Sequence, residues 1–201
     1  MSTAKNEDVK RRLAMAHLRL IRRAACFALF ISASAFASNL PGPGDPAPDF
    51  SLTSQSGSQV SLQGYKGRWV ILFFFGDHSS EDVRLLACNL QRDLAKYRSF
   101  NAVIAGIGVT SPESNHNWAD KNGLTFPLLS DPDQVIAKAY GVQADGSNST
   151  GDGGLYEIIV ASSGKLKLSP RIVTNDFDGE SDHLLGCLQY FKDQATSTAG
   201  R

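Results

Sequence analysis

The sequence is poor in cysteine and has no clustered metal ligands. Its 201 residues include three cysteines and four histidines, and the cysteines form no CxxC pair. A structural zinc site normally takes four cysteine or histidine ligands at close spacing. We therefore expect neither a metal centre nor a bound cofactor.

An excess of one charge and a long apolar run are also absent. Twenty basic residues balance twenty acidic residues, which gives a formal net charge of zero. Nucleic-acid binding calls for a basic stripe, so we expect no nucleic-acid partner. The apolar runs fall short of the ~20 residues that span a bilayer. Membrane contact is expected only through the N-terminal segment, if that segment remains uncleaved.

The N-terminal segment has its own composition. A short apolar run at 24–31 follows the basic residues Lys10, Arg11, Arg12, Arg19, Arg22 and Arg23, and the small-residue sequence ASAFA ends at Ala37. This order is typical of a secretory signal peptide. We expect residues 1–37 to target the chain, with Met1 or Met15 as the start and cleavage after Ala37.

The expected destination is a periplasm. Two alternatives stay open at this point: an uncleaved amphipathic anchor, and a secretory route to an algal plastid. The second is considered because ASAFA resembles the signal junction of proteins sent to diatom plastids.

The remaining chain alternates strand and helix patterns. Apolar runs at 69–75 and 102–109 are too short for free-standing helices and predict buried central strands. Alternating strands and helices, followed by a hairpin and a last helix, predict a three-layer α/β sandwich with a central sheet over residues 49–192. Further expected elements are an extended lead-in at 38–48, a hairpin turning at Ser56 and Gly57, an edge segment at 126–129, strands at 156–160 and 166–172, helices from Ser80 and at 111–121, 133–140 and 182–192, a flexible loop at 143–154 and a flexible tail at 193–201.

The helix after the first buried strand carries Cys88. Ser79 or Ser80 is expected to cap its start, and the residues of its apolar face are Val83, Leu86, Leu90 and Leu94. Cys88 lies one position away from this face, which predicts a half-buried thiol. Thiol-based redox enzymes present their sulfur in this order of strand, loop and helix.

Three stretches together resemble one family. PGDPAPDFSL at 43–52 resembles the entry segment of peroxiredoxins of the AhpC/TSA family. SPESNHNWADKNGLTFPLLSDPDQVIAKAYGV at 111–142 resembles the PrxQ, or bacterioferritin-comigratory, branch, and 69–88 resembles its active-site strand, loop and helix. The resemblance covers about 43–192. It implies a thioredoxin-like fold with a central mixed sheet and a thiol peroxidase (antioxidant) lineage.

The family's active-site positions are mostly changed here. Its loop reads Pro, three residues, Thr, two residues and the peroxidatic Cys, often with a resolving Cys five positions later. Placed without gaps, this pattern puts the Pro on Gly76, the Thr on Ser80, the peroxidatic Cys on Val83 and the resolving Cys on Cys88. The family's active-site Arg falls on Leu155.

These replacements remove the reacting groups. Peroxide reduction needs a thiolate stabilised by a nearby cation. Val83 has no lone pair to attack oxygen, and Leu155 supplies no charge for the departing oxygen. We therefore expect a degenerate, non-catalytic protein that acts by binding or assembly, as a monomer or weak dimer. Ser80 is expected to cap the helix rather than to bind a ligand.

Cys88 leaves other functions open. It is interpreted as a packing cysteine, as the partner of Cys187 in a disulfide between two helices on one face of the sheet, or as a working thiol. A working thiol predicts a thioredoxin-dependent hydroperoxide reductase, with peroxide as its substrate. Disulfide exchange of the CxxC type ranks last, because the loop holds no such pair.

Overall fold

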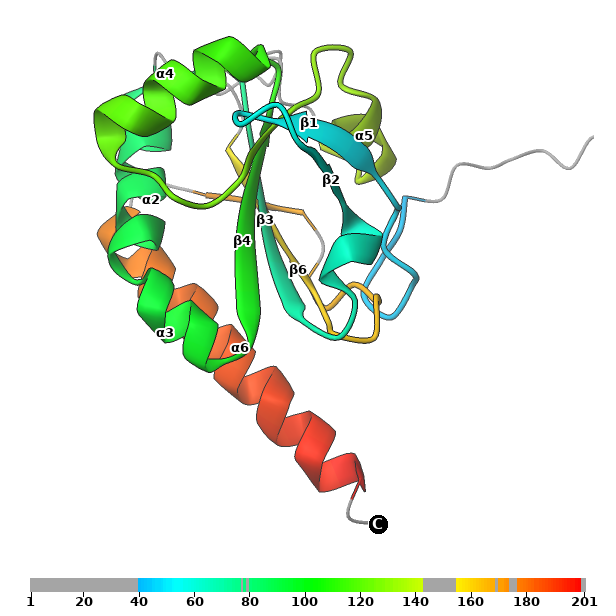
Figure 1. The fold of residues 1–201 in the computed structure, drawn as a ribbon. Coiled ribbons are helices and arrows are strands. Elements are labelled where there is room, and N and C mark those ends of the chain that lie inside the picture. Colours follow the sequence, from blue (N-terminus) through cyan, green and yellow to red (C-terminus); the bar gives the residue numbers. More distant parts are fainter. Residues whose placement is uncertain are drawn as a thin grey trace, which may run out of the picture. The chain divides into compact units, whose positions relative to one another are not determined.

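The computed structural model describes residues 40–142 except 77 and 79, residues 155–173 except 169, and residues 177–199. Seven strands form one mixed sheet in the order β2-β1-β5-β4-β3-β6-β7 (Figure 1). The strands are β1 (Ser51–Ser54), β2 (Gln59–Ser61), β3 (Trp69–Phe75), β4 (Ala102–Gly108), β5 (Leu128–Ser130), β6 (Tyr156–Val160) and β7 (Arg171–Ile172).

β3 is the central strand, as its apolar sequence predicts. All seven of its residues are buried, and it pairs with β4 in parallel and with β6 antiparallel. Two glycines in β4 make room for the aromatic rings of β3. A Cβ on Gly106 would lie 2.5 Å from the ring of Phe73, and one on Gly108 would lie 2.3 Å from the ring of Phe75. The large side chains of β3 therefore depend on small residues beside them.

Helices cover both faces of the sheet, which gives the predicted three layers. On one face the core includes residues of α2 (Glu81–Arg92), α3 (Leu94–Ser99), α4 (Pro112–Asn122) and α6 (Phe177–Ala199). On the other face it includes residues of the 3-10 helix η1 (Leu62–Tyr65) and of α5 (Val135–Ala139). In Figure 1, α2, α3 and α6 lie together on one side of the central strands, and α5 lies on the other side.

Several predicted boundaries are confirmed. β1 and β2 form the expected hairpin, with Gly57 at a positive φ of 78° in its turn. α4 begins after Ser111, whose side chain accepts a hydrogen bond from the backbone N–H of Ser114, and it ends at left-handed Gly123. A glycine in the left-handed conformation ends many helices in this way.

The predicted helix from Ser80 is two helices. Asp93 separates α2 from α3, and its backbone (φ −97°, ψ 10°) leaves the helical conformation. Burial alone would raise the pKa of the Asp93 carboxyl, but hydrogen bonds from Lys96, Arg92 and Ser181 outweigh burial and lower it to about 2. The apolar spacing did not reveal this break, because Leu94 continues the same apolar face.

The predicted edge segment at 126–129 is wrong in its position. β5 lies inside the sheet, paired with β1 on one side and β4 on the other. The strand predicted at 166–172 is also shorter than expected. Leu166 forms only an isolated bridge with Val160 of β6, and its backbone also exchanges hydrogen bonds with Gly44 and Asp45 of the lead-in. Among the described residues of this stretch, Arg171–Ile172 pairs with β6 as a strand.

The last helix is longer than predicted at both ends. α6 begins at Phe177, whose carbonyl accepts a hydrogen bond from the Asn89 side chain at 2.7 Å. It continues to Ala199, so residues 193–199 of the predicted flexible tail are helical. Asp193 supports the extension, because it accepts hydrogen bonds from the side chains of Gln189 at 2.7 Å and Thr196 at 2.8 Å.

The loop predicted at 143–154 lies outside the described residues. Within the part of the chain that the structure describes, none of the helices combines the length and apolar character needed to cross a membrane.

Candidate functional site

The start of α2 carries the positions that the family resemblance singled out. Ser80 is the N-cap residue, with an extended backbone (φ −73°, ψ 127°), but its side chain makes no capping hydrogen bond. The cap position is therefore confirmed, and the predicted side-chain bond is not made. Val83, in the first turn, is 3% exposed and points into the core.

Val83 and Leu155 belong to the same buried cluster. Leu155 is 5% exposed, immediately precedes β6 and accepts a backbone hydrogen bond from Val173 at 2.9 Å. The cluster also contains Phe75, at the end of β3, and Leu184 of α6. The two positions matched to the family's reacting thiol and cation are thus both occupied by buried hydrocarbon.

Cys88 is a half-buried free thiol, as its position on the helix predicts. Arg84, one turn earlier, interacts with it. That guanidinium is held mainly by Glu81, whose hydrogen bond and charge raise the pKa of Arg84 above its usual value. Cys88 therefore has a cation beside it, although a carboxylate shares that cation.

Cys187 is the second free thiol and lies on α6. α2 and α6 pack against each other. The structure holds both cysteines in the reduced form, and a disulfide between them stays a prediction.

His78, in the loop before α2, is packed rather than solvated. Its ring stacks on Trp118 with the centroids 4.4 Å apart and the planes 5° apart. Its Nε2 lies 2.8 Å from Oδ1 of Asn115, and the Thr110 hydroxyl donates to the same oxygen at 2.7 Å. These contacts attach the loop to α4.

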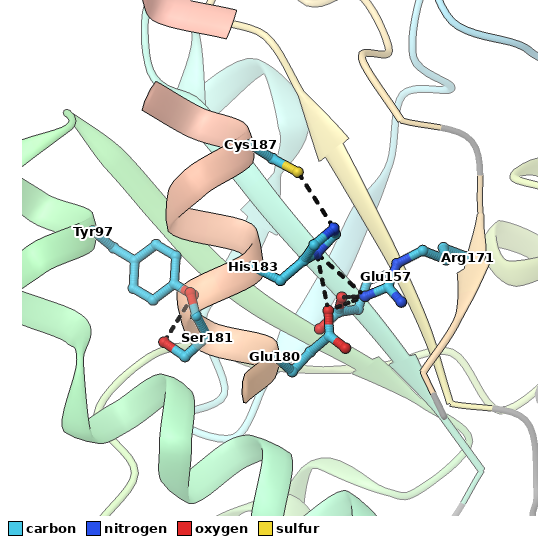
Figure 2. Close-up of polar contacts among 7 residues, drawn as sticks. All are labelled: Tyr97, Glu157, Arg171, Glu180, Ser181, His183 and Cys187. Atoms are coloured by element: carbon cyan, nitrogen blue, oxygen red, sulfur yellow. Dashed lines mark hydrogen bonds and ion pairs between the residues drawn. The ribbon is translucent and has the colours of Figure 1, made fainter. Parts of the chain in front are cut away.

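A second polar cluster lies between β6, β7 and α6 (Figure 2). Arg171 donates to Oε2 of Glu157 at 3.1 Å and also to Oε1 of Glu180. His183 places Nδ1 3.3 Å from Oε1 of Glu180, and its Nε2 lies 3.7 Å from Sγ of Cys187. The side chain of Arg171 is thus bound to two carboxylates, one from the sheet and one from the helix.

Burial sets the protonation of this cluster. Glu157 is 1% exposed, and desolvation raises its pKa to about 7 although Arg171 opposes the rise. Desolvation, aided by the charge of Arg171, lowers the pKa of His183. Desolvation also raises the pKa of Cys187, against the effect of Arg171. Near neutral pH the imidazole is therefore uncharged and the thiol keeps its proton.

Our reasoning from the sequence missed this cluster. One signal was present in the strand sequence YEIIV, where Glu157 is the single charge in an apolar run. A buried charge of this kind normally requires a partner. A second signal was the spacing of Glu180, His183 and Cys187, because positions i, i+3 and i+7 share one face of a helix.

The described residues contain no group of three or more His, Cys, Asp or Glu side chains placed to hold a metal ion.

Comparison with known proteins identifies the family. The model of the AhpC/TSA family matches residues 43–167. Peroxiredoxin Bcp of Escherichia coli is 31% identical over 144 residues, which are 70% of this chain and 89% of that protein. The chain therefore belongs to the AhpC/TSA family of peroxiredoxins, and its relatives include the Bcp and PrxQ proteins.

A Mycobacterium tuberculosis relative, whose name assigns it provisionally to the peroxiredoxins, is 38% identical over 103 residues. That match spans 51% of this chain and 66% of the relative. The crystal structure of peroxidoxin BcpB from the same organism superposes with a TM-score of 0.65 at 21% identity, covering 75% of this chain and 97% of that one. This likeness confirms the predicted thioredoxin-like fold.

Proposed function

We propose that the chain is an exported, PrxQ-like member of the peroxiredoxin family that has lost peroxide reduction and acts through binding or assembly. One observation carries the proposal. The positions matched to the peroxidatic cysteine and the active-site arginine hold Val83 and Leu155, both buried in one apolar cluster.

The chemistry of the reaction supports this conclusion. A thiolate must attack one peroxide oxygen, and a nearby positive charge must stabilise the negative charge that develops on the other oxygen. A valine side chain has no attacking atom, and a leucine side chain offers no charge. The apolar cluster around these two side chains also disfavours a thiolate, since an unpaired buried charge is costly.

A turnover assay tests the proposal. The reduced protein is given hydrogen peroxide or an alkyl hydroperoxide, with thioredoxin or dithiothreitol as reductant. We expect peroxide loss at the rate of a Cys88→Ser, Cys187→Ser control. Turnover comparable to that of an ordinary PrxQ would refute the proposed loss of activity.

The half-buried free thiol of Cys88 at the matched resolving position motivates a second candidate. In that alternative Cys88 is the reactive thiol of a thioredoxin-dependent hydroperoxide reductase. It predicts that Cys88→Ser abolishes turnover while Cys187→Ser leaves it intact.

The predicted disulfide between Cys88 and Cys187 has its own test. The unreduced protein is aged, and its peptides are mapped for a pair linked through these two residues.

Export is part of the proposal and rests on the N-terminal sequence alone. Cleavage after Ala37 predicts that the exported protein begins at Ser38. N-terminal sequencing of the protein recovered from the periplasm checks this. A chain that still carries residues 1–37 and stays with the membrane would favour an anchor.

A further inference from the structure

We propose that Cys187, His183 and Glu180 form a second thiol site, in which His183 takes the thiol proton so that Cys187 exchanges with a low-molecular-weight disulfide. The site lies on α6, and none of its residues belongs to the positions matched to the peroxiredoxin centre. The inference does not depend on the proposed loss of peroxidase activity.

The geometry is that of a nucleophile, a base and an orienting carboxylate. Sγ of Cys187 lies 3.7 Å from Nε2 of His183, within reach of a sulfur hydrogen bond. On the other side of the ring, Nδ1 lies 3.3 Å from Oε1 of Glu180. The three side chains lie along one face of α6 in Figure 2, on the side turned toward Arg171. A base held by a third group is the general arrangement of an activated nucleophile.

Glu180 favours the useful tautomer of His183, because its carboxylate Oε1 lies 3.3 Å from Nδ1 and accepts a hydrogen bond from it. Nη2 of Arg171 lies 3.5 Å from Nδ1 and competes as a donor there, but it makes its shorter hydrogen bond to Oε1 of Glu180. Two donors converge on one carboxylate oxygen if Nδ1 carries the proton. Nε2 then carries a lone pair that faces the thiol. This nitrogen is the proton acceptor that the exchange step requires.

The protonation states match this arrangement. Burial, followed by the charge of Arg171, lowers the pKa of His183, so the imidazole is in its basic form near neutral pH. Burial raises the pKa of Cys187 above its ordinary value of 9.0. Without a base, under about 1% of this thiol would be ionised at pH 7. A proton acceptor therefore has a large effect on its reactivity.

Solvent can reach the pair. Cys187 is half-buried and the His183 side chain is 49% exposed. The charged groups facing His183 are Arg171 from β7 and Glu180 from its own helix, and Arg171 also binds Glu157 of β6. Glu180 balances the charge of Arg171, and Glu157 adds a partial negative charge near pH 7, so the site has no excess positive charge that would favour an anionic disulfide. A compact disulfide of either charge fits this chemistry.

The exchange step is balanced as follows. The thiol proton of Cys187 moves to Nε2 of His183, and the sulfur attacks one sulfur of the disulfide RSSR. The S–S bond breaks, and its electron pair leaves with the departing sulfur, which takes the proton from His183. Cys187–SH and RSSR become Cys187–S–SR and RSH. A high-pKa thiol is intrinsically a strong nucleophile once it is deprotonated.

The test uses 4,4′-dithiodipyridine with the full chain carrying Cys26→Ser and Cys88→Ser, so that Cys187 is the only thiol in the sequence. Release of thiopyridone gives the rate, and mass spectrometry of peptides locates the adduct. We expect the rate to level off above the pKa of His183 and to stay flat to pH 8. His183→Gln should lower the rate at pH 7 about tenfold or more, because general bases contribute on that scale.

His116→Gln is the matched control. His116 also faces a carboxylate on an exposed helix surface, Asp120 at 3.5 Å, but it lies on α4. It should leave the rate unchanged. If His183→Gln reacts as fast as its parent, the proposal is wrong. The parent alone supplies a second criterion: a rate that climbs tenfold per pH unit from pH 6 to 8 is that of an unassisted thiol and would overturn the assignment.

Discussion

Glu157 is the residue whose charge is least compatible with its surroundings. It is 1% exposed, Arg171 binds its Oε2, and its Oε1 is buried without a hydrogen-bond partner among the described residues. Its raised pKa is the consequence, since one ion pair compensates only part of the cost of removing a carboxylate from water.

This carboxyl predicts a pH-dependent stability. Its pKa is about 7 in the folded protein against an ordinary 4.5, so the folded state holds the proton more tightly. The contribution of Glu157 is therefore fully present below pH 4.5 and is lost as the pH rises through 7. We expect the free energy of unfolding of the parent to fall by on the order of 1–3 kcal/mol between pH 5 and pH 8 because of Glu157. In Glu157→Gln this fall should be absent.

Urea denaturation at several pH values measures this difference. Glu113→Gln is the control, because Glu113 is an exposed carboxylate in the first turn of α4. Glu113→Gln should keep the pH dependence of stability that the parent shows. If Glu157→Gln also keeps that pH dependence, Glu157 is ionised in the folded protein throughout this range.

At this scale the sequence predicts apolar residues better than polar ones. Val83 and the aromatic residues of 69–75 were placed in the core from pattern alone, and the structure confirms it. Arg171 and Glu180 could not be paired in advance, because their contact depends on where β7 and α6 meet. Pattern along the chain carries no information about such distant neighbours.

Among the elements, α6 is attached to the rest of the fold by polar contacts as well as by its apolar face. Tyr97 of α3 is fully buried, and its hydroxyl lies 3.2 Å from the carbonyl oxygen and 3.1 Å from the hydroxyl of Ser181. Figure 2 places this pair across the helix from the Arg171 cluster. The first turns of α6 are thus bound on two sides.

Tyr97→Phe should cost about 1–2 kcal/mol of unfolding free energy, because it removes a buried hydrogen bond to Ser181, whose hydroxyl then keeps only its hydrogen bond to Asp93. Tyr190→Phe makes the same chemical change on the exposed part of α6, where Tyr190 is 60% exposed. It should change stability by less than about 0.5 kcal/mol. Equal effects of the two substitutions would show that the Tyr97 hydroxyl contributes nothing to the attachment of α6.

Element types were predictable, while their ends and neighbours were less so. The continuous apolar runs identified β3 and β4 because a fully buried strand needs no polar face. β5 was taken for an edge since it is short, but strand length says nothing about pairing on both sides. α6 was cut short at residue 192 because its exposed end has no apolar periodicity, although helix propensity and side-chain bonds continue it.

For the whole molecule, the family's fold and the proposed loss of its reacting groups lead to different conclusions. The thioredoxin-like sheet and the family match establish descent from peroxiredoxins. The packing of Val83 and Leu155 shows that the protein keeps its core intact with hydrocarbon at these two positions. Fold therefore identifies the lineage, and the side chains of the site decide the activity.

A single-turnover experiment tests this account most directly. The fully reduced protein is mixed with one equivalent of hydrogen peroxide, and the rate constant for peroxide loss is measured without any added reductant. We expect a rate constant no larger than that of an ordinary thiol, both in the protein and in a Cys88→Ser variant. Rapid loss of one equivalent that disappears in Cys88→Ser would show that a displaced thiol has taken over the reaction, and the account would be wrong.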